Sequence, residues 1–329
     1  KKRPPKRWPL NCLLKYEYYG ITCLLCPLKT LKPILGFFFR INYTKNDNNY
    51  DTFMINNLIK NETPLVICDI GASPVDPTPF IDELFKNINC FLYGFEPNEE
   101  EFQKLNSTDK KKYFNYAVGN GQSEVLNICA SPGMTSILEP DFEYLELFHG
   151  FSDWAKVIKK VKIKTKKLDD VNFNKKIDFL KIDVQGYEYE VIKNGNNIIK
   201  DCLIIQLETS PIPLYKNEKS FAHICLQLEY LGFQLHSFNK INTRCFKPVT
   251  FQNNIYSGLN HLFQLDCVFI KKLDLLDKLD LEQLRKIVLI LFYSFGSYDL
   301  VDYIVSKISK LEKEEIILRI DELVEQHMV

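Results

Sequence analysis

The chain has 329 residues, of which 46% are hydrophobic and 26% are charged, enough apolar material to fill a sizeable core. Lys plus Arg and Asp plus Glu both number 42, so the formal net charge is zero and lacks the basic excess of a nucleic-acid binder. With only 13 Gly and 15 Pro, collagen-like and low-complexity classes are also excluded. We therefore expect a globular protein with no nucleic-acid partner.

The first 60 residues read as a basic extension. Residues 1–40 contain nine Lys or Arg residues and one acid, Glu17, so nine minus one gives a charge of +8. Such a segment, mixed with Leu, Tyr and Phe, could make a peripheral contact with an anionic membrane surface. The alternative, which we favour slightly, is an extension packed on the domain with its charges in water.

Ten cysteines are scattered along the chain. Cys23 and Cys26 have the spacing of a metal or redox pair, but no second pair follows at a zinc-like distance. This usage indicates a reducing, cytoplasmic compartment.

From residue 64 onward, short β-branched runs alternate with helical patterns, which is typical of βαβ units and a mostly parallel sheet. A tight turn at 119–121 predicts that the third and fourth strands form a hairpin. Residues 131–154 form an aromatic-rich insertion, and residues 273–325 are helical with a break at 295–298. The expected strands are 65–70, 90–95, 113–118, 124–129, 161–166, 177–182, 202–207, 233–238 and 266–270. The expected helices between them are 80–85, 98–105, 187–194 and 221–231.

A ligand-binding edge is predicted where the first strand ends, at Asp69-Ile-Gly71-Ala72. In an open α/β sheet, ligands bind beyond the carboxyl ends of the strands, and a glycine there lets a ligand approach the backbone. The loop that follows, 73–77, lacks the further glycines of a dinucleotide fingerprint and the Gly-Lys-Ser/Thr of a P-loop. The ligand is therefore expected to be of another kind.

Two further acids stand at strand ends. Glu96 closes the second strand, 27 residues after Asp69, where an acid can accept two hydrogen bonds from a ribose diol. Its alternative role is that of a solvated strand-end acid. Asp183 closes the strand at 177–182, and we expect it to face the same pocket. Lys181 is an ion inside that apolar strand, which is best explained as a buried partner for one of these acids.

An ordered set of segments between residues 64 and 272 resembles the FkbM-type methyltransferase family. The broad resemblance rests on 66–72 (VICDIGA), 95–97 (FEP), 116–119 (YAVG), 168–170 (LDD), 179–186 (FLKIDVQG) and 266–269 (DCVF). A narrower similarity adds 132–136 (PGMTS), 147–151 (LFHGF) with Trp154, 256–260 (YSGLN) and 295–299 (FGSYD). No single motif is decisive, but so many in one order are hard to match by chance.

The resemblance implies an α/β, Rossmann-like class I methyltransferase sheet of seven strands, mostly parallel, with the last one antiparallel. It implies S-adenosylmethionine as the methyl donor and O-methylation, usually of a sugar or glycan hydroxyl. The loop at Ser73-Pro74 departs from the broader family, where further glycines are common, so the contacts of that loop stay open. Carried over by position, Asp69 and Gly71 line the methionine end of a pocket whose floor runs to Ala72. Glu96 holds the ribose, and Ala117 and Val118 flank the adenine. Asp183 lies near the sulfonium and the acceptor.

Methyl transfer to a hydroxyl needs alignment of donor and acceptor and a base for the hydroxyl proton. The candidate bases are Asp183, His149 and Glu208. His149 lies in the aromatic insertion, which is either a lid that stacks on a sugar acceptor or a flap that closes the core. Glu208 faces the acceptor or caps a turn. The pair at 169–170 suits helix capping better than Mg²⁺ binding, so no metal site is expected.

These assignments divide the chain into a basic extension (1–60), a methyltransferase domain (61–272) and a helical annex (273–329) that packs on the domain or makes an oligomer. One rival function is a dinucleotide or nucleotide-sugar enzyme on the same fold, against which the missing glycines count. Another is a non-catalytic adaptor in glycan assembly, against which the presence of Asp69, Gly71, Glu96 and Asp183 counts. Fold and cofactor do not fix the acceptor.

Overall fold

The computed structural model describes residues 63–74, 78–308 and 310. The predicted basic extension, with Cys23 and Cys26, lies outside the described residues, as does the tail beyond residue 310. The chain divides into two units, 1–46 and 47–329, and every described residue belongs to the second. No helix in the described part is both long and apolar enough to cross a membrane.

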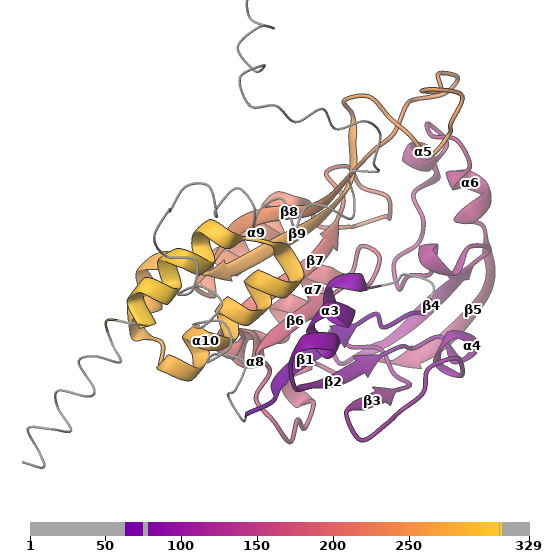
Figure 1. Cartoon of the computed structure of the whole chain (residues 1–329). Coiled ribbons are helices and arrows are strands. Elements are labelled where there is room, and N and C mark those ends of the chain that lie inside the picture. The colour runs from indigo at the N-terminus through magenta and orange to yellow at the C-terminus, as the bar shows by residue number, and fades with distance from the viewer. Residues whose placement is uncertain (1–62, 75–77, 309, 311–329) are drawn as a thin grey trace, which may run out of the picture. The chain divides into compact units, whose positions relative to one another are not determined.

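Seven strands form one sheet in the order β3-β2-β1-β6-β7-β9-β8 (Figure 1). Neighbouring strands pair in parallel, except that β9 runs antiparallel to both β7 and β8. The expected class I methyltransferase sheet, mostly parallel with an antiparallel last strand, is thus confirmed. The strands are β1 (Leu65–Ile70), β2 (Cys90–Phe95), β3 (Lys111–Phe114), β6 (Phe179–Ile182), β7 (Ile204–Thr209), β8 (Phe233–Thr243) and β9 (Leu262–Lys271).

Helices cover both faces of the sheet, which is why its central strands are apolar along their whole length. All six residues of β1 are buried, and its successive side chains enter the cores on opposite faces. On one face lie α3 (Pro79–Asn87) and α10 (Leu281–Ile290). On the other lie α7 (Glu188–Lys193), α8 (Asn196–Asp201) and α9 (Phe221–Tyr230).

The described part of the tail packs on the sheet. Asp280 and Gln283 form a capping box that starts α10, and Leu284 and Ile287 enter the same core cluster as Leu65. The helix continues through η5 (Leu291–Phe295) and breaks at Gly296, whose φ of +60° is left-handed. The predicted break at 295–298 is therefore confirmed.

The predicted hairpin between the third and fourth strands is wrong. β3 stays in the main sheet beside β2, whereas β4 (Ser123–Cys129) pairs antiparallel with β5 (Val157–Lys164) in a separate two-stranded sheet. Packing between aromatic rings favours this arrangement. Phe114 stacks on Phe95 at 5.3 Å, and Tyr116 packs on the same ring at 5.3 Å, which fixes the chain after β3 against β2.

The aromatic insertion forms a third, smaller core together with residues 212–215 after β7 and Phe263 of β9. Its short helices are η2 (Pro132–Met134), α5 (Phe142–Leu145) and α6 (Phe151–Trp154). Phe148 and Phe151 are buried against Phe263 of β9, at ring distances of 4.9 and 4.4 Å. This small core stands beside the carboxyl ends of the main strands (Figure 1).

Candidate functional site

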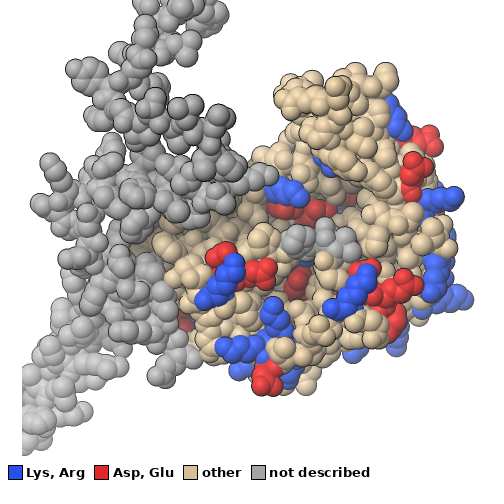
Figure 2. All heavy atoms as spheres, turned by 45° about the vertical axis from the view of Figure 1, so that its right-hand side comes forward, with Lys and Arg blue, Asp and Glu red and all other residues tan. Residues whose placement is uncertain are grey.

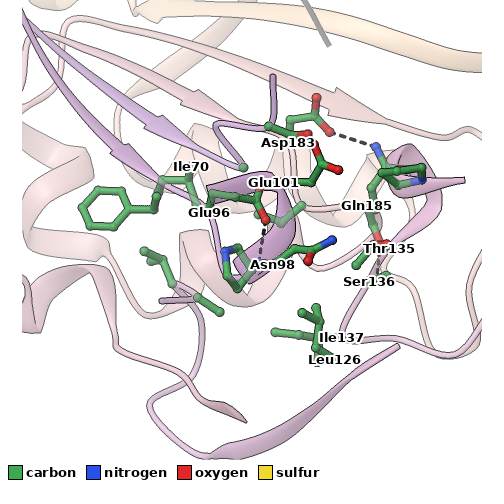
Figure 3. A pocket seen from close by; sticks show the side chains of 18 of the residues that line it. Ile70, Glu96, Asn98, Glu101, Leu126, Thr135, Ser136, Ile137, Asp183 and Gln185 are labelled. Atoms are coloured by element: carbon green, nitrogen blue, oxygen red, sulfur yellow. Dashed lines mark hydrogen bonds between the residues drawn. The ribbon is translucent and has the colours of Figure 1, made fainter. Parts of the chain in front are cut away.

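A cavity of about 700 Å³ opens at the carboxyl ends of β1, β2 and β6 (Figure 3). The position is the one expected for a ligand of an open α/β sheet. Its wall comes from the ends of β1, β2 and β6, from the chain after β3 and from the aromatic insertion. The residues are Ile70, Gly71, Ser73, 95–98, Glu101, 116–118, Leu126, Pro132, Gly133, 135–137 and 183–185.

The floor of the cavity depends on a close approach between the ends of β1 and β6. Gly71 has a φ of +85°, and a Cβ atom placed on it would lie 1.8 Å from the carbonyl oxygen of Asp183. Only glycine fits both that backbone conformation and that contact. Asp69 and Ala72 are buried beneath the floor and do not line the cavity, whereas Gly71 does.

Lys181 holds the floor together as a buried cation. Its Nζ lies 3.0 Å from Oδ1 of Asp69 and 3.6 Å from Oδ2 of Asp183, and it donates to the carbonyl of Gly71 at 3.2 Å. Burial raises the pKa of Asp69, and the charge of Lys181 offsets part of that effect. The predicted role of Lys181, a buried partner for these acids, is confirmed.

Glu96 lines the cavity from the end of β2. It is buried, and its Oε1 accepts a hydrogen bond of 2.7 Å from the backbone N–H of Asn98. Burial raises the pKa of Glu96 to about 7, and the nearby charges of Glu101 and Asp69 add to the rise. Among the described wall residues, none donates a hydrogen bond to the second carboxylate oxygen, which can meet a ligand donor.

Glu101 is a wall residue that sequence reasoning missed. Its side chain starts on α4 (Glu99–Phe102) and is only 5% exposed. Oε1 accepts from Lys104 at 2.7 Å, but Oε2 is buried without a hydrogen-bond partner. A buried acceptor without a donor is costly, so this oxygen is suited to a ligand hydroxyl or ammonium group. Glu96 and Glu101 lie close together in Figure 3.

Gln185 joins two of the predicted acids. Its Nε2 donates to Oδ1 of Asp183 and to Oε1 of Glu208, both at 2.9 Å, and the first of these bonds is drawn in Figure 3. Its Oε1 accepts from the hydroxyl of Tyr215 at 3.1 Å, and its carbonyl accepts from Ser136 at 2.6 Å. These contacts hold Gln185 at a φ of +54°, an uncommon value for a residue other than glycine.

A second, much smaller cavity is lined by Gln185 as well. Gln185 lines both cavities, Asp183 lines only the larger one, and Glu208 lines only the smaller one. The pKa of Glu208 is raised well above its ordinary value, first by burial and then by the charges of Asp183 and Asp266. Two of the three predicted bases thus lie on either side of one glutamine.

The remaining predicted residues are divided between the cavity and its surroundings. Ala117 and Val118 line the larger cavity beside Tyr116, where they offer a small apolar wall to a flat ring. His149 lines neither cavity, because its Nε2 lies 3.1 Å from the carbonyl oxygen of Val249 in the loop between β8 and β9.

The described residues contain no group of three or more His, Cys, Asp or Glu side chains arranged to hold a metal ion. Asp169 instead accepts hydrogen bonds from the backbone N–H groups of Asn197 and Ile198, between 3.0 and 3.2 Å, and so caps α8.

A family profile identifies the family of this chain. The sequence profile of the Methyltransferase FkbM domain matches residues 69–235, just over half of the chain, and includes Glu96, Asp183 and Glu208. The chain belongs to the FkbM methyltransferase family. It is therefore an S-adenosylmethionine-dependent methyltransferase. No protein of curated function matches its sequence.

Solved structures show distant similarity to this FkbM methyltransferase. The FkbM methyltransferase of Methylobacillus flagellatus KT is 12% identical, with a TM-score of 0.34, and the match covers 63% of this chain and 43% of that one. Magnesium protoporphyrin IX methyltransferase (ChlM) of Synechocystis PCC 6803, solved with bound SAM, is 11% identical with a TM-score of 0.34, covering 76% and 87%. M. jannaschii TYW2, solved with AdoMet, is 10% identical with a TM-score of 0.28, covering 70% and 80%.

The residues present fit S-adenosylmethionine. With the donor bound, Glu96 and Glu101 would offer carboxylate oxygens to the ribose and Ala117 and Val118 an apolar wall to the adenine, over the close backbone floor at Gly71 and Asp183. When bound, the sulfonium supplies an electrophilic methyl group. The excess of acids over bases in the wall suits the positive charge of the donor.

We expect the affinity for S-adenosylmethionine to rise with pH through about 7, because Glu96 accepts ribose hydroxyls best when ionised. With a pKa of about 7, its ionised fraction falls about tenfold between pH 8 and pH 6, so Kd should rise about tenfold. The stability of the ligand-free enzyme runs the other way. Because folding raises the pKa of Glu96, this group stabilises the folded state fully below about pH 4.5. That contribution to stability is lost as the pH rises through about 7.

Isothermal titration calorimetry at pH 6, 7 and 8 measures this dependence. The Glu96→Gln variant should bind more weakly and lose the Glu96 contribution, leaving only the titration of the ligand's own α-amino group. Glu100→Gln, a change at an exposed residue outside the wall, should keep the wild-type profile. Equal pH profiles for wild type and Glu96→Gln would reject the ribose role.

Proposed function

We propose that this methyltransferase transfers its methyl group to a hydroxyl of a sugar or glycan, with Asp183 as the general base. The observation that carries the proposal is the position of Asp183. It lines the donor cavity at the carboxyl end of β6, and Gln185 links it to Glu208 in the neighbouring cavity. The hydroxyl of an acceptor placed between the two cavities would lie beside Asp183.

The reaction needs little more than alignment and a base. Asp183 takes the hydroxyl proton while the acceptor oxygen forms a bond to the methyl carbon, and the carbon–sulfur bond breaks with its electron pair left on sulfur. Gln185 fixes the orientation of Asp183 through the 2.9 Å hydrogen bond, and Lys181 keeps the carboxylate anchored to the floor. Gln185 is thus a positioning residue.

The smaller cavity has the chemistry of a site for a hydroxyl-rich acceptor. Its wall carries amide, hydroxyl and carboxyl groups from Gln185, Gln264, Thr209, Glu208 and Glu218. Burial and the charges of Asp183 and Asp266 raise the pKa of Glu208, which shifts it toward the protonated carboxyl, a group that can donate as well as accept. The described residues that line the two cavities include no Lys, Arg or His, which favours a neutral acceptor over a phosphorylated one.

A panel of neutral oligosaccharides, incubated with the enzyme and methyl-labelled donor, tests the proposal. Mass spectrometry should find the label in sugar methyl ethers, which resist mild alkali, whereas methyl esters would be cleaved. Label recovered only in alkali-labile esters or in amines would contradict O-methylation of a hydroxyl. Donor binding without transfer to any sugar would favour the rival adaptor function.

A further inference from the structure

Exposed apolar side chains gather in one part of the molecule. The described residues include 19 large hydrophobic side chains classed as exposed, and ten of them fall in two short segments, 142–149 and 244–262. We name these two segments the apolar tip. Its exposed members are 36–59% accessible, namely Phe142, Tyr144, Leu147, Phe246, Val249, Phe251, Ile255, Tyr256, Leu259 and Leu262. A cluster of this kind marks an interaction surface.

The apolar tip is held together by specific contacts. Lys247 donates its backbone N–H to the carbonyl of Leu147 at 2.9 Å, and the rings of Phe148 and Phe246 lie 5.0 Å apart. Tyr256 stacks on Trp154 with ring centroids 5.6 Å apart and planes 5° from parallel. Because Phe148 is itself buried in the third core, the exposed side chains stand on a fixed base.

The apolar tip lies beyond the ends of β8 and β9. In Figure 1 the loop between these strands rises above the rest of the described chain, with α5 beside it. Figure 2 shows the same top region as a bulge that is almost entirely tan, while charged side chains surround the lower part. A projecting apolar surface can insert into a deformable, flat partner surface, and such a partner needs no preformed binding groove.

The charges around the loop indicate the sign of that partner. The 35 residues from Leu231 to Leu265 contain no Asp or Glu, and Lys240 and Lys247 are exposed there, whereas Arg244 turns inward and donates to the carbonyls of Thr243 and Tyr256. Acids occur on the other segment of the tip, where Glu143 and Glu146 of the α5 region are exposed. The loop at 244–262, rather than α5, is therefore the side that suits a negatively charged surface.

We propose that the apolar tip docks this enzyme on an anionic lipid bilayer. Aromatic and aliphatic side chains of the loop enter the interface, and the exposed side chains of Lys240 and Lys247 reach the headgroups, the combination that membrane–water interfaces favour. The proposal does not depend on the identity of the methyl acceptor. It also differs from a contact through the N-terminal basic residues, because the side chains that bind are apolar and lie in the loop.

The chain carries a natural reporter for this contact. It contains two tryptophans, Trp8 and Trp154, and Trp154 stacks on Tyr256 of the apolar tip. The 329-residue chain with Trp8→Phe therefore has a single tryptophan, Trp154, next to the loop. Titrated with phosphatidylcholine vesicles that contain phosphatidylserine as the anionic lipid, it should show a blue-shifted Trp154 emission that brominated lipids quench.

Two variants in the Trp8→Phe background separate the tip from other surfaces. Val249→Ser with Leu259→Ser removes apolar side chains that are 56% and 58% exposed, and should lower vesicle partitioning at least about fivefold. Leu226→Ser with Tyr230→Ser changes side chains of α9 that are 66% and 76% exposed, and should leave partitioning unchanged. Unchanged donor binding in both variants, measured by calorimetry, verifies that they fold.

Salt and lipid composition complete the test. Attraction between basic residues and headgroups is screened at 0.5 M salt, whereas the entry of apolar side chains persists, so Trp154 should still be quenched there once bound. Partitioning should be weaker on pure phosphatidylcholine. The proposal is overturned if Trp154 is not quenched, or if the tip variant binds as well as wild type. It is also overturned if the tip variant instead abolishes self-association in sedimentation with no vesicle binding, which would assign the tip to a second copy of the chain.

Discussion

Asp183→Asn should lower the rate of methyl transfer by about 10²- to 10⁴-fold, the usual size of a general-base contribution. The amide has nearly the same shape and can still accept the hydrogen bond from Gln185, but it cannot take the hydroxyl proton. Binding of S-adenosylmethionine should change only a few-fold, because the carboxylate of Asp183 is one of several wall groups. Single-turnover kinetics and calorimetry on the same preparation measure the two effects.

Two comparisons make this result specific. Asp170→Asn, a change at an exposed acid outside both cavities, should retain the wild-type rate. Gln185→Met should lower kcat more than it changes KM and should shift the pH profile, as expected for a residue that acts through Asp183. If Asp183→Asn keeps its rate, the base is one of the other candidates, and Glu208→Gln and His149→Ala then distinguish them.

Lys181→Met should destabilise the enzyme by about 3–5 kcal/mol, the cost of leaving a buried charge without its partner. Lys181 is buried and lies 3.0 Å from Asp69, which is buried beneath the floor. Without the cation, the pKa of Asp69 should rise further above its ordinary value. The loss of stability should therefore be smaller at acidic pH and should grow as the pH rises. Urea unfolding at pH 5 and pH 8 measures both quantities.

The matched control is Lys86→Met, because Lys86 pairs with Glu83 at 2.7 Å on an exposed helix surface. Such pairs contribute little, so the change should stay within about 0.5 kcal/mol. Adding Asp69→Leu to Lys181→Met should recover part of the lost stability, since an apolar pair is tolerated better than a lone buried acid. A loss below about 1 kcal/mol for Lys181→Met would show that the ion pair does not hold the floor.

The central strands were predictable because their burial leaves a direct trace in the sequence. The runs at 65–70 and 90–95 match β1 and β2 to the residue, since strands covered on both faces must be apolar throughout. The pairing of β3 was not predictable from the turn at 119–121. Its partner is set by rings 19 residues apart, Phe95 and Phe114, and a local turn signal carries no information about them.

In the site, too, some residues were predictable from the sequence and others were not. Glu96 and Asp183 were predictable because the carboxyl ends of parallel strands meet at one edge of the sheet, so acids at those ends come together. Glu101 and Gln185 were not. The burial of Glu101 depends on how α4 packs, and the position of Gln185 depends on a left-handed backbone held by Ser136 and Tyr215, neither of which has a spacing rule.

The contact between Gly71 and Asp183 also bears on how the enzyme acquires its ligand during folding. Gly71 and Lys181, which meet beneath the ligand, are 110 residues apart in the chain. Loops of that length close late, and a nascent chain that has emerged only as far as β5 has no floor on which a ligand can rest. Donor binding is therefore a property of the completed sheet. Its free energy is added to global unfolding, by about 2.7 kcal/mol when the donor stands at a hundred times its Kd.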